Sequence, residues 1–287
     1  MKHALVLLML LAAAAAQSQT IVEFASLDAP EGRPVQLKAH WHPVAATPAP
    51  AVALFHGCGG MYDRKGQVSE RMRDYTALLN QQGFHVLMVD SLTRRGEREI
   101  CTQRNGDRKV TQLHRRRDAL ASLQWLAQRP EVSAQRIGMM GWSNGGSTVL
   151  SATNGHLTDV SGLSVKPAFA VAYYPGCEAE LKRGYAPTAP LLILMGEADD
   201  WTPAEACRQL VAQAVGARPE METYAGAHHG FDSAAPARLR KDVPNGVNPG
   251  QGVHVGGNAA ALNRSRERLK EFLQAYLSSP ALPQNTR

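Results

Sequence analysis

The sequence is poor in several features that would mark particular classes of protein. Its 287 residues include only four cysteines, Cys58, Cys101, Cys177 and Cys207, and these form no C-x-x-C pair. Without such a pair, a zinc-binding module is not expected. No internal repeat is visible, so the chain is not predicted to be a repeat protein.

Dense clusters of charge of one sign are also scarce. The formal net charge is +6, and the only compact basic run is 114–117, with Asp118 beside it. This run lies in a helix-like stretch, and we interpret it as a solvated helix face. Nothing else resembles a nucleic-acid-binding module, so nucleic acid is not an expected partner.

Long apolar runs are missing as well. The apolar stretch 4–16 follows Met1 and Lys2 and is shorter than the ~20 residues that a membrane span needs. A basic start, a short apolar core and small residues at its end predict a secretory signal, residues 1–16, cleaved before Gln17. A buried N-terminal helix is the alternative, but the run has no polar face. We therefore expect an exported protein, periplasmic or secreted, with one domain over 17–287 and no membrane contact after cleavage.

Export and an even number of cysteines together favour disulfides. Four cysteines allow three pairings, and the sequence does not choose among them. Cys177 and Cys207 follow two consecutive predicted strands, which favours that pair. Cys58 has the alternative of remaining a free, small residue near the functional site.

Alternating strands and helices predict the fold class. Residues 35–42 alternate between apolar and polar side chains, as in a half-buried antiparallel strand. Continuous apolar runs, typical of parallel strands covered on both faces, occupy 51–55, 84–89, 136–140, 169–174 and 191–195. Helical patterns end before Gly83 and Pro130, and others cover 203–215 and 259–277. The order indicates an α/β fold with a mainly parallel sheet. Residues 232–258, rich in glycine, proline and charge, form a loop that is either functional or mobile.

One motif carries the strongest chemical signal. Gly141-Trp142-Ser143-Asn144-Gly145 is a G-x-S-x-G pattern between a predicted strand and a predicted helix. That context is the one a nucleophile elbow requires, since the glycines permit the close approaches of a sharp turn. Ser143 is therefore the candidate nucleophile.

Loops after other predicted strands supply possible partners. The glycine-rich loop 56–60 offers the Cys58 N–H as an oxyanion donor beside the Asn144 N–H. Asp199 and Asp200 follow the strand 191–195 and compete for the role of the acid that orients a histidine. His228 and His229 lie in the loop after 221–224, and a histidine there is the candidate general base. The order serine, aspartate, histidine is that of the α/β hydrolases.

With these motifs, the chain resembles the dienelactone hydrolase family of the α/β-hydrolase fold, over roughly 34–277. The matching stretches are 56–60, Asp90-Ser91 with Arg94-Arg95-Gly96, 141–146, 196–203 and 229–231. The resemblance implies helices on both faces of a mainly parallel sheet. It also implies that Asp199 is the acid and His229 the base, which leaves His228 outside the triad.

The sequence departs from the best-known members of that family at several positions. Those members have a cysteine nucleophile and a glutamate where this chain has Ser143 and Gly57. They also bind a substrate carboxylate with arginines. Arg94 or Arg95 could match one of these, while the other position falls near Ser233. Arg94, Arg95 and Trp201 are therefore the candidate substrate-binding residues.

We predict a serine hydrolase that cleaves a small-molecule carboxylic ester or lactone through an acyl-enzyme. A peptidase or an acyltransferase with the same triad is an alternative, as is a binding protein that kept the fold without catalysis. No metal or other cofactor is implied. Two adjacent histidines, His228 and His229, seldom point to one ion, and the sequence shows no third ligand.

Overall fold

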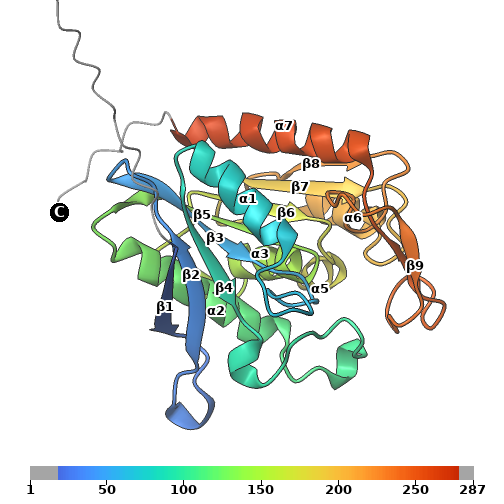
Figure 1. Ribbon diagram of the computed structural model, residues 1–287, viewed down its shortest axis with the longest axis horizontal. Helices are drawn as coiled ribbons and strands as arrows, with labels where there is room; N and C mark the ends of the chain where they lie inside the picture. Colours follow the sequence, from blue (N-terminus) through green and yellow to red (C-terminus); the bar gives the residue numbers. More distant parts are fainter. Residues whose placement is uncertain (1–18, 278–287) are drawn as a thin grey trace, which may run out of the picture.

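The computed structural model of the chain describes residues 19–277. An eight-stranded sheet forms its centre, in the order β1-β2-β4-β3-β5-β6-β7-β8 (Figure 1). The predicted signal peptide, residues 1–16, lies outside the described part of the chain. Between residues 19 and 277, no helix is long and apolar enough to cross a membrane.

The sheet is antiparallel at one edge and parallel elsewhere. Its strands are β1 (Thr20–Ala25), β2 (Gln36–His42), β3 (Ala49–Phe55), β4 (His85–Asp90), β5 (Val132–Trp142), β6 (Phe169–Tyr173), β7 (Leu191–Gly196) and β8 (Glu220–Tyr224). β2 pairs antiparallel with both β1 and β4, whereas β4, β3, β5, β6, β7 and β8 are joined by parallel pairings. Because parallel strands share one direction, the loops after β3, β5 and β7 all emerge at the carboxyl ends of the strands.

Helices cover both faces of the sheet. The helices are α1 (Glu70–Gln81), α2 (Gln112–Ala127), α3 (Asn144–Thr153), α4 (Thr158–Ser161), α5 (Glu178–Arg183), α6 (Ala204–Gln213) and α7 (Ala259–Leu277), with short 3-10 turns at η1 (Pro30–Gly32), η2 (Thr93–Arg95) and η3 (Asn105–Asp107). In Figure 1, α1 and α7 lie together on one face and α2 and α3 on the other. The predicted fold class, a mainly parallel sheet with helices on both faces, is confirmed.

Burial of the strands follows the sequence pattern. All seven residues of β3 are buried, as expected for a parallel strand covered on both faces. On β2, Leu37, Ala39 and Trp41 face the core, which confirms the predicted half-buried strand. His40 is buried as well, although its polar side of the strand was expected to face solvent. Its ring reaches the Tyr62 hydroxyl, at 2.9 Å from Nε2.

The basic run 114–117 is not the solvated helix face that the sequence predicted. Arg115 is fully buried, and Arg116 is nearly so. Arg116 Nε lies 2.9 Å from a carboxylate oxygen of Asp159, which compensates for its burial. Arg115 instead reaches loops at the end of the sheet. These arginines are buried because their partners, such as Asp159, lie in other parts of the chain, and the local sequence does not reveal them.

Both pairs of cysteines form disulfides. Cys177 pairs with Cys207, as the sequence favoured, and Cys58 pairs with Cys101. The alternative of a free Cys58 was therefore wrong. Two disulfides are typical of proteins that fold in an oxidising compartment.

The segment 232–258 forms a small structure of its own, which we name the wall segment. Within it, β9 (Arg238–Arg240) and β10 (Val253–Val255) pair as a short antiparallel ribbon. Val255 also forms a parallel bridge with His229. The wall segment is thereby attached to the loop after β8, and Figure 1 shows β9 beyond the end of the sheet toward which the arrow of β7 points.

Candidate active site

Ser143 lies at a sharp turn between β5 and α3. Its backbone has φ 54° and ψ −119°, a conformation that side-chain-bearing residues rarely adopt. A Cβ on Gly141 would lie 2.3 Å from the carbonyl oxygen of Gly145, and one on Gly145 would lie 2.0 Å from that of Phe55. Glycine is therefore required at both positions of this motif, and the strained turn holds the Ser143 hydroxyl above the sheet.

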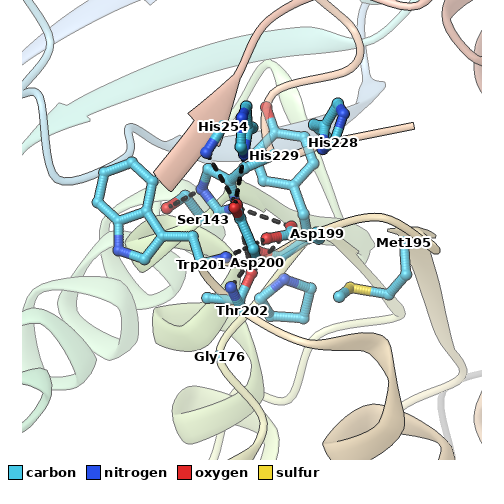
Figure 2. Close-up of polar contacts among 12 residues, drawn as sticks. Ser143, Gly176, Met195, Asp199, Asp200, Trp201, Thr202, His228, His229 and His254 are labelled. Atoms are coloured by element: carbon cyan, nitrogen blue, oxygen red, sulfur yellow. Dashed lines mark hydrogen bonds and ion pairs between the residues drawn. The ribbon is translucent and has the colours of Figure 1, made fainter. Parts of the chain in front are cut away.

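The hydroxyl of Ser143 is the first member of a hydrogen-bonded series. Ser143 Oγ lies 2.8 Å from Nε2 of His229, and His229 Nδ1 lies 2.8 Å from Oδ2 of Asp199 (Figure 2). The histidine and the aspartate are both buried. The loops after β5, β7 and β8 thus bring together the three side chains that the sequence identified, in a geometry suited to proton transfer from the serine.

Asp199 and Asp200 face different surroundings although they are adjacent. Asp199 Oδ1 accepts hydrogen bonds from the N–H groups of Trp201 and Thr202, at 2.9 and 2.8 Å. The Thr202 hydroxyl lies 3.1 Å from Asp199 Oδ2. These donors fix the carboxylate that faces His229. Asp200 turns outward to His254 and does not contact His229 (Figure 2). The geometry therefore favours Asp199 for the acid position.

Two backbone N–H groups flank the Ser143 hydroxyl. Asn144 is the first residue of α3, where an N–H has no partner inside the helix. Cys58 follows β3, and its N–H has no acceptor between residues 19 and 277. The Cys58–Cys101 disulfide and a hydrogen bond from Ile100 N–H to Cys58 O, 2.8 Å, hold this second loop in place.

Arg115 connects the two loops that carry these N–H groups. Its guanidinium donates to the side-chain oxygen of Asn144 and, at 2.7 Å, to the carbonyl oxygen of His56. Burial lowers the pKa of Arg115 to about 10, so the group stays charged at neutral pH. Burial and the nearby Arg115 charge also lower the pKa of His56 to about 4, which keeps that ring neutral. Arg115 is thus a positioning residue that sequence reasoning missed.

Two cavities meet at Ser143. Cys58, Ser143 and Trp201 line both. The smaller has a volume of about 270 Å³ and is bounded on one side by the wall segment. The larger, about 690 Å³, runs past the start of α2 and α5. The indole of Trp201, whose centre lies 4.7 Å from that of the His229 ring, lines both cavities.

Comparison with known proteins identifies the family. Residues 38–277 match the family model described as the dienelactone hydrolase family. The chain belongs to the dienelactone hydrolase family. Members of this family hydrolyse carboxylic esters, and the chain is an enzyme of that class. A search among curated proteins gave no match.

Solved structures of related esterases share the fold. Esterase 2 of Thermogutta terrifontis, described as phosphoramylated by tabun, has a TM-score of 0.63 at 17% identity, over 94% of this chain and 100% of that one. A dienelactone hydrolase-like promiscuous phosphotriesterase from metagenomic libraries gives 0.61 at 16%, over 91% and 99%. A dienelactone hydrolase of Anabaena variabilis gives 0.60 at 19%, over 90% and 99%. At such identities the likeness establishes the fold.

The two arginines suggested by the dienelactone hydrolase resemblance do not line either cavity. Arg94 pairs with Glu23 on the surface. Arg95 is nearly buried between Asp28 and Asp118, with 2.8 Å from its Nη2 to an oxygen of each. Both guanidinium groups are occupied by ion pairs with these carboxylates. The expectation that Arg94 or Arg95 faces the substrate is therefore not met by the geometry.

Three other arginines line the smaller cavity, and no sequence motif marks them. Arg71 comes from α1, whereas Arg238 and Arg240 come from the wall segment. Arg71 Nη2 lies 3.0 Å from Asp232, and the Arg240 guanidinium lies 5.8 Å from the centre of the Trp201 ring. Of the predicted substrate-binding residues, only Trp201 lies at the cavities. In this member of the family the basic lining thus comes from segments that no family motif marks.

Proposed function

We propose that the protein hydrolyses carboxylic esters or lactones through a covalent acyl-enzyme on Ser143. The observation that carries this proposal is the continuous series Ser143 Oγ–His229 Nε2 and His229 Nδ1–Asp199 Oδ2, with 2.8 Å at each contact. His229 takes the proton of the hydroxyl as the oxygen attacks the carbonyl carbon. Asp199 holds the tautomer of His229 that can accept this proton and stabilises the imidazolium that forms.

The negative charge of the tetrahedral intermediate develops on the former carbonyl oxygen. The N–H groups of Cys58 and Asn144 are the donors proposed to stabilise it, each typically worth about 3 kcal/mol. Arg115 would help to hold both donors in position, since it forms hydrogen bonds with the side chain of Asn144 and with the carbonyl oxygen of His56. The intermediate collapses, His229 returns the proton to the leaving alcohol, and the acyl group remains on Ser143.

Hydrolysis of the acyl-enzyme repeats these steps with water. His229 removes a proton from the water that attacks the acyl carbonyl, and then protonates Ser143 Oγ as the acid is released. A lactone would follow the same course, with alcohol and acid in one product. The residues proposed for each step all belong to this chain.

The two cavities suggest where the parts of an ester lie. They meet at Ser143, so the acyl group and the alcohol occupy opposite arms. In the smaller arm, Arg71 pairs with Asp232 and Arg240 pairs with Asp242. Arg238 also lines this arm, and its charge favours a substrate with a carboxylate or other negative group at that end. The acyl group's carbonyl would then lie beside the indole of Trp201.

We also propose that the protein is exported, in line with the sequence of residues 1–16. The two disulfides support this, because they persist in oxidising compartments such as the periplasm. The partner implied in that compartment is a small-molecule ester or lactone.

The decisive experiment replaces the nucleophile. Ser143→Ala is expected to lower kcat for an aryl ester on the order of 10⁶-fold with the Tm nearly unchanged. Ser161→Ala, an exposed serine on α4, is the matched control. A fluorophosphonate should add its mass to Ser143 in the wild type and in the control only. Full activity or labelling in Ser143→Ala would overturn the proposal.

A substrate panel then separates the alternatives. Aryl esters, lactones and peptide amides, each as a neutral and an anionic version, are compared by kcat/KM. We expect esters and lactones to be cleaved and amides not, with preference for the anionic version. Cleavage of amides alone would indicate a peptidase, and labelling without turnover of any class would indicate a binding protein.

A further inference from the structure

A group of metal-ligating side chains lies beside the candidate active site. Asp200, His228 and His254 each offer one ligand atom, and these three atoms lie within 4.8 Å of one another. They come from the loop after β7, the loop after β8 and the strand β10. The sequence showed no third ligand for the histidine pair, because His254 is remote along the chain and only the fold brings it near.

The ring of His228 is oriented for coordination. Its Nδ1 lies 2.8 Å from the carbonyl oxygen of Ala198, to which the Nδ1–H donates. This bond leaves the lone pair on Nε2 free. Metal-binding histidines in proteins are held in the same way, with the second ring nitrogen donating to a carbonyl or a carboxylate.

His254 and Asp200 form the other half of the group. Nδ1 of His254 lies 2.7 Å from Oδ2 of Asp200, and the His254 backbone N–H donates to Oδ1 at 2.8 Å. The carboxylate is thereby fixed against the strand. The rings of His228 and His254 have their centres 5.1 Å apart, with 31° between their planes. In Figure 2, His254 and His228 are drawn above Asp200, and dashed lines join His254 to Asp200.

The donor set selects the class of ion. Two imidazole nitrogens and one carboxylate oxygen suit Zn²⁺ and similar divalent transition metals, whereas Ca²⁺ and Mg²⁺ prefer oxygen ligands alone. The side chains of His254 and Asp200 are 48% and 33% exposed, so an ion can enter from solvent. Three protein ligands leave the fourth position of a tetrahedral zinc site for water.

We propose that Asp200, His228 and His254 form a binding site for a divalent transition-metal ion of the zinc class. The ion binds Nε2 of His228, Nδ1 of His254 and the Asp200 carboxylate. The ion takes the place of the proton on Nδ1 of His254. That proton passes to solvent, and Nε2 of the neutral ring carries a proton taken from solvent in its place.

The site connects the loops of the candidate triad to the wall segment. Asp200 and His228 are the chain neighbours of Asp199 and His229. Gly256, two residues beyond His254, lines the smaller cavity, and its N–H donates to the carbonyl oxygen of His229 at 3.0 Å. A bound ion would therefore hold the wall segment over the cavity. Its role is to fix the shape of that arm, and Ser143 is not needed for binding.

Direct binding measurements test the site. Tag-free protein carrying Ser143→Ala is stripped with a chelator, dialysed and titrated with ZnCl₂ in competition with a chromogenic chelator. We expect one Zn²⁺ per chain, with affinity at least about tenfold weaker in His254→Ala and in Asp200→Asn. The exposed His156→Ala is the matched control and should bind as tightly as its parent. CaCl₂ should not compete.

Thermal unfolding of the same proteins gives a second readout. At about 100 times the Kd, Zn²⁺ should raise the Tm by about 5 °C in the parent and in His156→Ala. No such rise is expected in His254→Ala. Asp200→Asn keeps an acceptor for the His254 N–H and serves if His254→Ala does not fold. Absence of saturable binding, or equal binding in parent and His254→Ala, would overturn the site. Because the parent already lacks Ser143, these results are independent of the proposed hydrolysis.

Discussion

The candidate triad and the wall segment are built in different ways, although Asp199 and Asp200 are adjacent in sequence. Asp199 belongs to the triad: it is buried and bonded to backbone N–H groups at the end of a core strand. Asp200 belongs to the surface, where it bonds His254 of a three-residue strand. This difference indicates that the loops after the core strands position the candidate triad. The short β9–β10 ribbon of the wall segment borders the smaller cavity instead.

Substitution of the two adjacent aspartates is expected to affect different kinetic constants. Asp199→Asn should lower kcat about 10⁴-fold, because an amide beside His229 favours the wrong tautomer. Asp200→Asn should act mainly on KM, by a few-fold, because it loosens the wall segment without touching His229. Steady-state kinetics on one aryl ester in chelator-treated buffer measure both. An equal loss of kcat in the two variants would show that Asp200 affects catalysis as much as Asp199 does.

The two disulfides are expected to contribute similarly to the free energy of unfolding but differently to kcat. Each closes a loop, with sequence separations of 43 and 30. Removing either pair as a double alanine variant should cost about 4 kcal/mol of unfolding free energy. Only Cys58→Ala with Cys101→Ala should also lower kcat, by about tenfold, since Cys58 carries a proposed oxyanion donor.

Chemical denaturation and kinetics at 20 °C separate these two effects. Cys177→Ala with Cys207→Ala is the matched control, because neither of these cysteines lines either cavity. Equal kcat in the two double variants would show that the Cys58–Cys101 bond stabilises the fold without positioning the donor.

The smallest expected effect concerns the wall segment alone. A Cβ on Gly256 would lie 2.5 Å from Ala237 Cα, at a φ of +143°. Gly256→Ala should displace β10 from β9 and raise KM by about threefold, with kcat and Tm little changed. Gly250, at φ +83° with nothing within 4 Å, is the control in the same segment. A larger loss of kcat than of substrate affinity would mean that the wall segment also positions His229.

Much of the fold could be predicted because its signals are local. Continuous apolar runs marked the parallel strands, and the side chains after them had to meet at one edge of the sheet. That rule brought Ser143, Asp199 and His229 together without any knowledge of distances. The glycines at 141 and 145 were equally readable, because a sharp turn permits no other residue there.

The rest depends on contacts between remote segments. Arg115 looked like one of several surface arginines, and its burial depends on Asn144 and on the His56 carbonyl. Cys58 could be paired only once the loop containing Cys101 was placed over it. The arginines of the smaller cavity, and the meeting of His228 with His254, depend on how the wall segment folds back. No periodicity or motif encodes such pairings.

The meeting of two cavities at Ser143 has a kinetic consequence. In the proposed mechanism, an acyl group held in one cavity would leave the other cavity vacant once the alcohol departs. The next nucleophile would then approach Ser143 through the cavity that the alcohol had left. Water and small alcohols then compete for one position beside His229. The fate of the acyl group, hydrolysis or transfer, becomes a question of which acceptor fills that arm first. The ratio of hydrolysis to acyl transfer would then depend on the concentrations of water and alcohol as well as on the enzyme.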